Sequence, residues 1–350
     1  MLTLGIESSC DETGVSIVEW SKEKNKINIL AEEVHSQVKL HAEYGGVVPE
    51  LAAREHTTNL EHVMDAALTS SNCNLSDLSQ IAVTTGPGLK GCLLTGMLYA
   101  SGLSEALSIP LVPVNHIEAH VLSVFIDHPD IPLPFIALIV SGGHTELQFI
   151  EDIGKYHLIA RTIDDAAGEA FDKSANLLGI DYPGGATLAK LADSYAIDNN
   201  SESAPYSLPA VMKGSPGFSF SGLKTAISLL IKKEMDSATL STKETKAALS
   251  YSIQESITDS LVSKTKNAID LLKCNRVAVV GGVSANSTLR EKIDGIEGTD
   301  SYYPTPYHCR DNGTMIATCA IYRERNKLPH APFTAQPRWK IETKDISGKI

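Results

Sequence analysis

Residues 135–149 read FIALIVSGGHTELQF: an apolar run, a turn of small polar residues and a second run that alternates between apolar and polar side chains. Strand-forming residues on both sides of a Ser-Gly-Gly turn predict a β-hairpin. The N-terminus has the same organisation, because LTLGIE at residues 2–7 alternates as a strand, SSCDETG turns the chain and residues 15–18 return. An ordinary polar hairpin remains the alternative for either turn taken alone. Together the two hairpins predict a duplicated fold whose ligand, held partly by backbone amides, lies between the copies.

The segments between and after the hairpins alternate between strands and helices. Strands are expected at 27–35, 81–83 and 111–114, and helices at 50–70 and from the GPGLKG segment (86–91) to residue 106. This alternation is typical of an α/β fold. Gly-Pro-Gly is equally consistent with a simple strand-to-helix turn and with an anion site at the exposed helix N-terminus.

The second half carries further polar turns. In DDAAGEAFDK (164–173), Asp164 and Asp165 are expected to cap a helix, which leaves Asp172 to line a polar pocket with the Pro-Gly-Gly turn at 183–185. A buried strand at 276–280 runs into GGVSAN (281–286), a glycine turn that lets the backbone approach a base or ribose.

Composition limits the class of protein. A chain of 350 residues with 43% hydrophobic side chains is globular and should hold about two domains. Six cysteines without a CxxC pair, and an N-terminus without a basic leader, predict a reduced, cytoplasmic protein. The net charge of −12 argues against unassisted binding of nucleic acid, whose affinity comes mainly from neutralising phosphates.

The segment NHIEAH at 115–120 places two histidines, His116 and His120, four residues apart. On a helix this spacing stacks both rings on one face, where they can reach one metal ion. A third ligand must come from elsewhere; the candidates are Asp311, His144 and a carboxylate near the N-terminus. Glu118 lies about 200° round the helix from His116, which disfavours a zinc protease because that chemistry needs Glu beside the metal-bound water. A pair of packed or surface histidines is the alternative interpretation.

Taken together, these stretches resemble the bacterial TsaD family, also known as Gcp or YgjD and formerly as O-sialoglycoprotein endopeptidase. The resemblance covers nearly the whole chain and rests on several segments in order: GIESSCDETG, YGGVVPELAAREH, GPGLKG, NHIEAH, LIVSGGHTEL, DDAAGEAFDK, YPGG, FSFSGLKTA, GGVSAN and CRDNGTMIA.

The resemblance implies a two-lobed actin/Hsp70/sugar-kinase-like (ASKHA) fold with duplicated RNase H-like lobes. The expected lobes are residues 1–112, on which a C-terminal helix packs back, and residues 113–350, with the metal site at the cleft between them. The implied activity is transfer of a threonylcarbamoyl group from L-threonylcarbamoyladenylate to N6 of adenosine 37 in tRNAs reading ANN codons, with release of AMP. Expected partners besides tRNA are TsaB-like and TsaE-like proteins and a TsaC-type enzyme that supplies the adenylate.

The family's functional residues carry over onto matching positions. One divalent metal, Fe²⁺ with Zn²⁺ as the alternative, is expected on His116, His120 and Asp311. Asp11 is expected near the reacting centre as the base. The substrate pocket, for threonylcarbamoyl-AMP or ATP, ADP or AMP, is expected at Ile139, Val140, Ser141, Gly142, Gly143, Asp172, Gly185 and Asn286.

Two departures and two rival classes accompany this resemblance. Arg310 stands where many relatives have Thr beside the metal aspartate, and Ala186 stands where Pro is common. A sugar or acetate kinase of the same superfamily would explain the hairpins but would not explain a converging His-His-Asp set. A regulatory ATPase would also leave that set without a purpose.

The tRNA contacts are expected to include Lys39, His41 and Arg54, with Arg338 in the tail.

Overall fold

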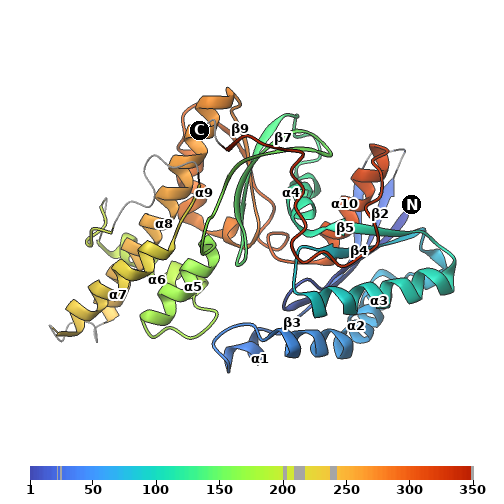
Figure 1. Cartoon of the computed structure of the whole chain (residues 1–350), viewed down its shortest axis with the longest axis horizontal. Coiled ribbons are helices and arrows are strands. Elements are labelled where there is room, and N and C mark those ends of the chain that lie inside the picture. The colour runs from blue at the N-terminus through green and yellow to red at the C-terminus, as the bar shows by residue number, and fades with distance from the viewer. Residues whose placement is uncertain (22, 24–25, 200–202, 209–216, 237–242, 348–350) are drawn as a thin grey trace. The chain divides into compact units, whose positions relative to one another are not determined.

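The computed structural model describes residues 1–21, 23, 26–199, 203–208, 217–236 and 243–347, which form two compact units (Figure 1). Unit 1 comprises Met1–Pro132, Asp152–Lys155 and Pro304–Glu342; unit 2 comprises Leu133–Glu151, Tyr156–Tyr303 and the described residues from Thr343 onwards. The boundary expected between residues 112 and 113 therefore falls inside unit 1. The chain stays in unit 1 through the helix that follows residue 115, because that helix packs on the returning C-terminal segment.

Unit 1 is built on a five-stranded sheet of order β3-β2-β1-β4-β5. β1 pairs antiparallel with β2 and parallel with β4, and β5 continues the parallel half of the sheet. The carboxyl ends of β1, β4 and β5 therefore meet at one edge. The strands are Leu2–Glu7 (β1), Glu12–Ser21 (β2), Lys26–Ser36 (β3), Gln80–Gly86 (β4) and Leu111–Asn115 (β5).

Strand alternation sends the side chains of β1 to two different helical layers. Leu4 and Ile6 are fully buried in a core with residues of the helices α2 (Pro49–Ser71) and α3 (Lys90–Leu107). Gly5, between them in the sequence, faces α10 (Gly313–Arg325), which also packs on α4 (His116–Asp127). α10, from the C-terminal part of the chain, also contacts β2 of this sheet. The shorter helices of this unit are α1 (Val38–Ala42) and η1 (Leu75–Asp77).

Unit 2 repeats the same topology. Its sheet has the order β10-β9-β6-β7-β8-β11. Read from the other edge, β8-β7-β6-β9-β10 corresponds strand by strand to β3-β2-β1-β4-β5 of unit 1, and β11 is an additional strand next to β8. β6 pairs antiparallel with β7 and parallel with β9, as β1 does with β2 and β4. The duplicated fold predicted from the two hairpins is thereby confirmed. The strands are Phe135–Val140 (β6), Thr145–Asp152 (β7), Lys155–Arg161 (β8), Arg276–Val280 (β9), Asp300–Tyr302 (β10) and Lys344–Asp345 (β11).

The helices of unit 2 share one apolar core, in which Phe218 and Phe220 are fully buried. Among the described helices of either unit, none is both long enough and apolar enough to cross a membrane. The helices of unit 2 are Ala167–Leu177 (α5), Gly185–Asn199 (α6), Ser221–Asp236 (α7), Lys243–Leu272 (α8), Gly282–Ala285 (η2) and Ser287–Asp294 (α9).

The prediction that Asp164 and Asp165 cap the helix following them is wrong. α5 begins at Ala167 and its N-cap, Ala166, makes no side-chain cap hydrogen bond. Asp164 instead accepts hydrogen bonds from the backbone N–H of Phe220 (2.7 Å) and the hydroxyl of Ser221 (2.7 Å), at the start of α7. The sequence pattern indicated a cap correctly but assigned it to the nearer helix, because a cap supplied from 56 residues away leaves no local signal.

Replacing Asp164 with alanine is expected to lower the free energy of unfolding by about 1–2 kcal/mol, because α7 loses its N-terminal hydrogen-bond acceptor. Asp165→Ala is the matched control. Asp165 pairs with Lys173 (2.7 Å) in a partly exposed ion pair, whose loss should cost about 0–1 kcal/mol. Urea unfolding of both variants gives the comparison, and an equal or larger loss for Asp165→Ala would contradict the capping role of Asp164.

Candidate metal centre and substrate pocket

His116 is the first residue of α4, directly after β5 ends at Asn115. The Asn115 side chain caps the helix by accepting hydrogen bonds from the N–H groups of Ile117 (2.8 Å) and Glu118 (3.1 Å). His120 follows one turn later, and the exposed fractions of the two histidines are 5% and 0%. The cap therefore sets the position at which both imidazoles leave the helix, at the carboxyl edge of the sheet.

Asp311 reaches the same place because α10 begins directly against β1. The side chain of Asn312 caps α10 by accepting from Met315 N–H (2.8 Å). Gly5 and Gly313 allow the backbones to touch, since a Cβ atom on Gly5 would lie 2.0 Å from the Gly313 carbonyl oxygen. This close approach holds the residues before α10, including Asp311, beside the end of β1.

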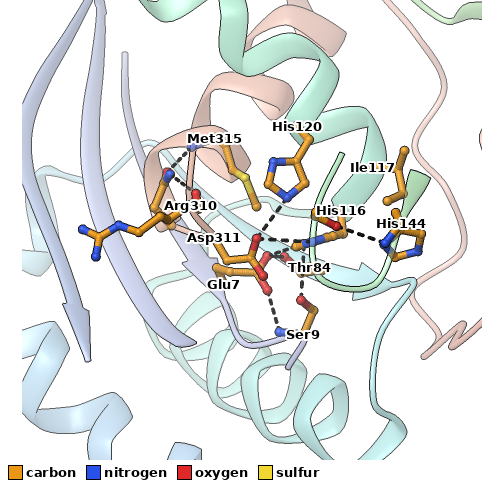
Figure 2. A network of polar contacts seen from close by, with 12 residues as sticks. Glu7, Ser9, Thr84, His116, Ile117, His120, His144, Arg310, Asp311 and Met315 are labelled. Atoms are coloured by element: carbon orange, nitrogen blue, oxygen red, sulfur yellow. Dashed lines mark hydrogen bonds and ion pairs between the residues drawn. The ribbon is translucent and has the colours of Figure 1, made fainter. Parts of the chain in front are cut away.

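The two histidines and Asp311 converge on one point (Figure 2). Asp311 Oδ1 lies 3.0 Å from His120 Nε2 and 3.7 Å from His116 Nε2. The imidazole rings stand nearly perpendicular, with centroids 4.7 Å apart. Of the three candidates for a third ligand, Asp311 is the residue that joins the histidine pair in unit 1; His144 belongs to unit 2.

The donor set fits a divalent metal. Ligands at about 2.0–2.2 Å from one ion lie roughly 3–3.5 Å from each other, and the ligand atoms here all lie within 4.8 Å of one another. His120 Nδ1 is buried without a hydrogen-bond partner among the described residues. Two imidazoles and one carboxylate also leave coordination positions open for a substrate.

Charge in the site is concentrated between Glu7 and Asp311. Burial lowers the pKa of His116, but the charges of Glu7 and Asp311 and the hydrogen bond to Glu7 outweigh it and raise that pKa to about 9. Burial would raise the pKa of Glu7, yet the charge of His116 and their hydrogen bond lower it below its ordinary value. With two carboxylates against one imidazole, the cluster has a negative electrostatic potential, which favours a bound cation.

Glu118 and Arg310 both lie away from this cluster. Glu118 accepts hydrogen bonds of 2.9 and 2.8 Å from Arg323 on α10, so the expectation that it faces away from the metal is confirmed. The guanidinium of Arg310 lies over the Tyr307 ring, 5.5 Å from its centroid, and points away from Asp311 (Figure 2). Neither side chain is placed to act on a bound ion's substrate.

Asp11 lies in the turn between β1 and β2. Three backbone carbonyl groups of this turn accept hydrogen bonds from three different segments of unit 1. Leu89 N–H donates to Ser9 O (2.8 Å), His56 Nε2 to Cys10 O (3.0 Å) and Gln37 N–H to Asp11 O (3.0 Å). Burial raises the pKa of the Cys10 thiol, and the charges of Asp11 and Asp311 raise it further.

The Gly-Pro-Gly turn at 86–88 is used for packing. A Cβ atom on Gly86 would lie 2.0 Å from Gln336 O, and Gly88 N–H donates to Pro337 O (3.3 Å). Of the two interpretations left open by the sequence, the strand-to-helix turn is therefore the one these contacts support, and the C-terminal segment covers it.

In unit 2, the hairpin turn lies at the carboxyl end of β6, beside that of the parallel strand β9. Ile139 and Val140 are buried in β6, whereas Gly142 and Gly143 are exposed, and a Cβ atom on either would meet no atom within 4 Å. The next turn is packed against this one, since a Cβ atom on Gly281 would lie 2.5 Å from Val140 O. The backbone at 142–143 is thus the exposed part of this hairpin.

Of the remaining residues predicted to bind substrate, Asp172 and Gly185 contact each other, and Asn286 caps a helix. Gly185 N–H donates to Asp172 Oδ1 (2.8 Å), so these two predicted residues lie in direct contact. Asn286 is the N-cap of α9: its Oδ1 accepts from Leu289 N–H (2.8 Å), and its Nδ2 donates to Gln254 Oε1 (2.8 Å). Asn286 therefore has a structural role in unit 2 whatever else it binds.

Known proteins resemble this chain in sequence and in fold. The sequence model of TsaD, described as tRNA N6-adenosine threonylcarbamoyltransferase, matches residues 28–318. A Chromobacterium violaceum protein named tRNA N6-adenosine threonylcarbamoyltransferase is 41% identical over 348 residues, which are 98% of this chain and 99% of that protein. The chain belongs to the TsaD family. It is accordingly a transferase that modifies tRNA, as its sequence motifs predicted.

Solved structures of other proteins share the fold of this TsaD chain. Component A of (R)-2-hydroxyglutaryl-CoA dehydratase from Acidaminococcus fermentans aligns with a TM-score of 0.54 at 15% identity, covering 93% of this chain and 99% of that one. HypF from T. kodakarensis aligns with a TM-score of 0.58 at 13% identity, covering 93% of this chain and 48% of that one. At such identities the likeness concerns architecture alone, and it agrees with the predicted actin/sugar-kinase-like fold.

Sequence reasoning missed two residues that shape the site of this TsaD protein. Glu7 contacts His116, and His56 receives a hydrogen bond from Thr13 Oγ1 (2.7 Å) while holding Cys10 O. Both residues stand inside quoted segments, GIESSCDETG and YGGVVPELAAREH. A polar side chain at the end of an otherwise apolar strand was the available signal for Glu7.

Proposed function

We propose that this enzyme transfers the threonylcarbamoyl group of L-threonylcarbamoyladenylate to N6 of adenosine 37 in tRNAs that read ANN codons, releasing AMP. The observation that carries the proposal is the convergence of His116, His120 and Asp311 in a chain that the TsaD model matches over residues 28–318. A kinase with this fold needs no such donor set. The ligands of the site are accordingly one divalent ion, Fe²⁺ with Zn²⁺ as the alternative, and the adenylate.

The chemistry follows from the weakness of the nucleophile. The lone pair of an exocyclic adenine amine is delocalised into the ring, so the enzyme must position the reactants and activate the acyl donor. His116, His120 and Asp311 hold the ion, which when bound supplies Lewis-acid polarisation and a template for the donor's oxygens. N6 bonds to the carbamoyl carbon, and the bond from that carbon to the phosphate oxygen breaks.

The chain's own groups complete the transfer in this proposal. The backbone amides at Gly142 and Gly143, with Ser141, bind the phosphate of the adenylate. Asp11 accepts the proton that N6 loses, and AMP leaves as a phosphate monoester. Asp172, Gly185 and Asn286 contact the nucleoside side of the donor, and Ile139 and Val140 support the turn.

The proposal and the kinase alternative give different products. Incubating the full chain and its partners with tRNA, threonine, bicarbonate and ATP, followed by mass spectrometry of the digested nucleosides, should reveal N6-threonylcarbamoyladenosine at position 37. A sugar or acetate kinase would leave the tRNA unmodified and phosphorylate a small molecule. Unmodified tRNA in the complete mixture would reject the proposed reaction.

The charge balance leads to a prediction about tRNA binding. A chain of net charge −12 repels a polyanion at long range, so we propose that TsaB-like and TsaE-like subunits supply positive surface, besides a TsaC-type enzyme supplying the adenylate. Within this chain, Lys39, Arg54 and Arg338 are exposed. His41, also expected to contact tRNA, is fully buried and bonds to Gln37 (3.1 Å), so that expectation is wrong.

We expect the isolated chain to modify tRNA at least about 10-fold more slowly than the mixture with its partners, and tRNA affinity of the mixture to fall steeply between about 50 and 200 mM salt. Arg54→Ala should reduce the slope of log affinity against log salt by about one, if Arg54 contacts a phosphate. Lys266→Ala, which removes an exposed charge in unit 2, is the control. Full turnover by the isolated chain, insensitive to salt, would contradict the prediction.

A further inference from the structure

Glu7 is a fully buried carboxylate at the carboxyl end of β1, and the reaction proposed above gives it no task. Its neighbours are Thr84 on β4, Ser9 in the following turn and His116 on α4. It therefore stands at the point where three elements of unit 1 meet behind the metal ligands (Figure 2).

The carboxylate has a defined partner for each oxygen. Oε1 accepts from Ser9 N–H (2.5 Å), and Oε2 accepts from the Thr84 hydroxyl (2.5 Å) and lies 3.1 Å from His116 Nδ1. Burying an ionised carboxylate is costly unless it is fully hydrogen-bonded and paired with opposite charge.

The partners of Glu7 decide which nitrogen of His116 is available. An ionised carboxylate only accepts hydrogen bonds, so Nδ1 of His116 must carry the proton that it donates to Oε2. In the neutral ring, the lone pair then lies on Nε2, which is the atom directed at Asp311 Oδ1 (3.7 Å). Ligating histidines commonly donate their second ring nitrogen to a carboxylate in this way, which fixes both tautomer and ring orientation.

We propose that Glu7 is a positioning residue that locks His116 as its Nδ1–H tautomer and so presents Nε2 to the metal ion. The inference rests on the proposed ligation by His116. It assigns to Glu7 no contact with the metal or with either substrate. Thr84 and Ser9, by occupying the other lone pairs, keep the carboxylate from turning away.

Titration of metal-free full-length chain with Co²⁺, against a competing chelator, tests the proposal. Glu7→Gln keeps the side chain's volume but removes the charge and replaces one acceptor oxygen with an amide donor. We expect the Co²⁺ affinity of Glu7→Gln to fall about 10–100-fold, because a metal-binding histidine loses the hydrogen-bond partner that fixes its tautomer and orientation. The matched control is Glu118→Gln, which alters a carboxylate that is 2% exposed on α4 and bound to Arg323.

A purely structural role predicts a different pattern. Glu7→Gln and Glu118→Gln would then lower the thermal midpoint of the metal-free chain alike while leaving Co²⁺ affinity equal to that of the wild type. That outcome overturns the inference. His116→Ala separates it from the proposed function: if this variant binds Co²⁺ like the wild type, the ligand assignment itself fails, whereas weak binding by His116→Ala with normal binding by Glu7→Gln defeats only the role of Glu7.

A measurement on the unaltered protein keeps the proposal testable if Glu7→Gln does not fold. In ¹⁵N ring spectra of the Zn²⁺-loaded full-length chain, assigned with His116→Ala, we expect His116 to be protonated at Nδ1 and metal-bound through Nε2. Protonation at Nε2 with metal on Nδ1 would overturn the inference, because Nδ1 could then not donate to Glu7.

Discussion

Replacing His116 with alanine is expected to remove the bound metal and to slow threonylcarbamoyl transfer by on the order of 10³-fold, since Lewis-acid stabilisation contributes several kcal/mol and each 1.36 kcal/mol is tenfold in rate. The ring's Nε2 lies 3.7 Å from Asp311 Oδ1, and its loss leaves one imidazole and one carboxylate. Two remaining ligands hold a divalent ion too weakly to survive purification. Elemental analysis of the purified variant and the rate of nucleoside formation should fall together.

The control for this prediction is a histidine that lies outside the site. His62 is exposed on α2, and His62→Ala should retain both metal and activity. Circular dichroism should show that His116→Ala keeps its fold, because α4 is capped by Asn115 rather than by the imidazole. Undiminished metal content in His116→Ala would mean that the ion binds elsewhere, and the ligand assignment would be wrong.

The predictable part of this structure is the part with a local signal. Strand-forming residues on both sides of short polar turns identified the two hairpins, whose first strands end at Glu7 and Val140. The spacing of His116 and His120 identified a shared helix face. These features depend on residues within a few positions of one another. Their outcome in the structure is a pair of sheets with the same strand order and a histidine pair that faces one point.

The third member of the cluster depends on packing across the chain. Sequence spacing alone left Asp311, His144 and an N-terminal carboxylate as candidates, and only the resemblance singled out Asp311. The deciding contact joins Gly5 and Gly313, more than 300 residues apart. The residues around each glycine give no signal that predicts its contact with the other.

The misassigned residues have the same cause. Asp164 caps a helix that begins 57 residues later rather than the next one, as its bond to Ser221 shows. The basic, aromatic and glycine residues around His41 predict a surface contact, yet His41 is buried on α1, where its ring nitrogens bond to Gln37 and to the backbone N–H of Val48. In each case a polar residue finds a hydrogen-bond partner that its own local propensity does not encode.

Gly5→Ala is expected to be strongly destabilising, with a loss of about 3 kcal/mol or more in the free energy of unfolding. The added Cβ would lie 2.0 Å from Gly313 O and 2.8 Å from Ala317 N, both of which are backbone atoms of α10. A flexible side chain could rotate away, but a helix backbone must shift as a whole. Urea unfolding monitored by circular dichroism gives the size of the loss.

The same substitution should also empty the metal site, because Asp311 precedes α10 and moves with it. Gly102→Ala is the matched control: a Cβ atom there, on α3, meets nothing within 4 Å, so the change should raise stability by about 0.5–1 kcal/mol through better helix propensity. If Gly5→Ala leaves both the free energy of unfolding and the metal content unchanged, α10 can move without cost. In that case the contact between Gly5 and Gly313 would not be what places Asp311 beside the two histidines.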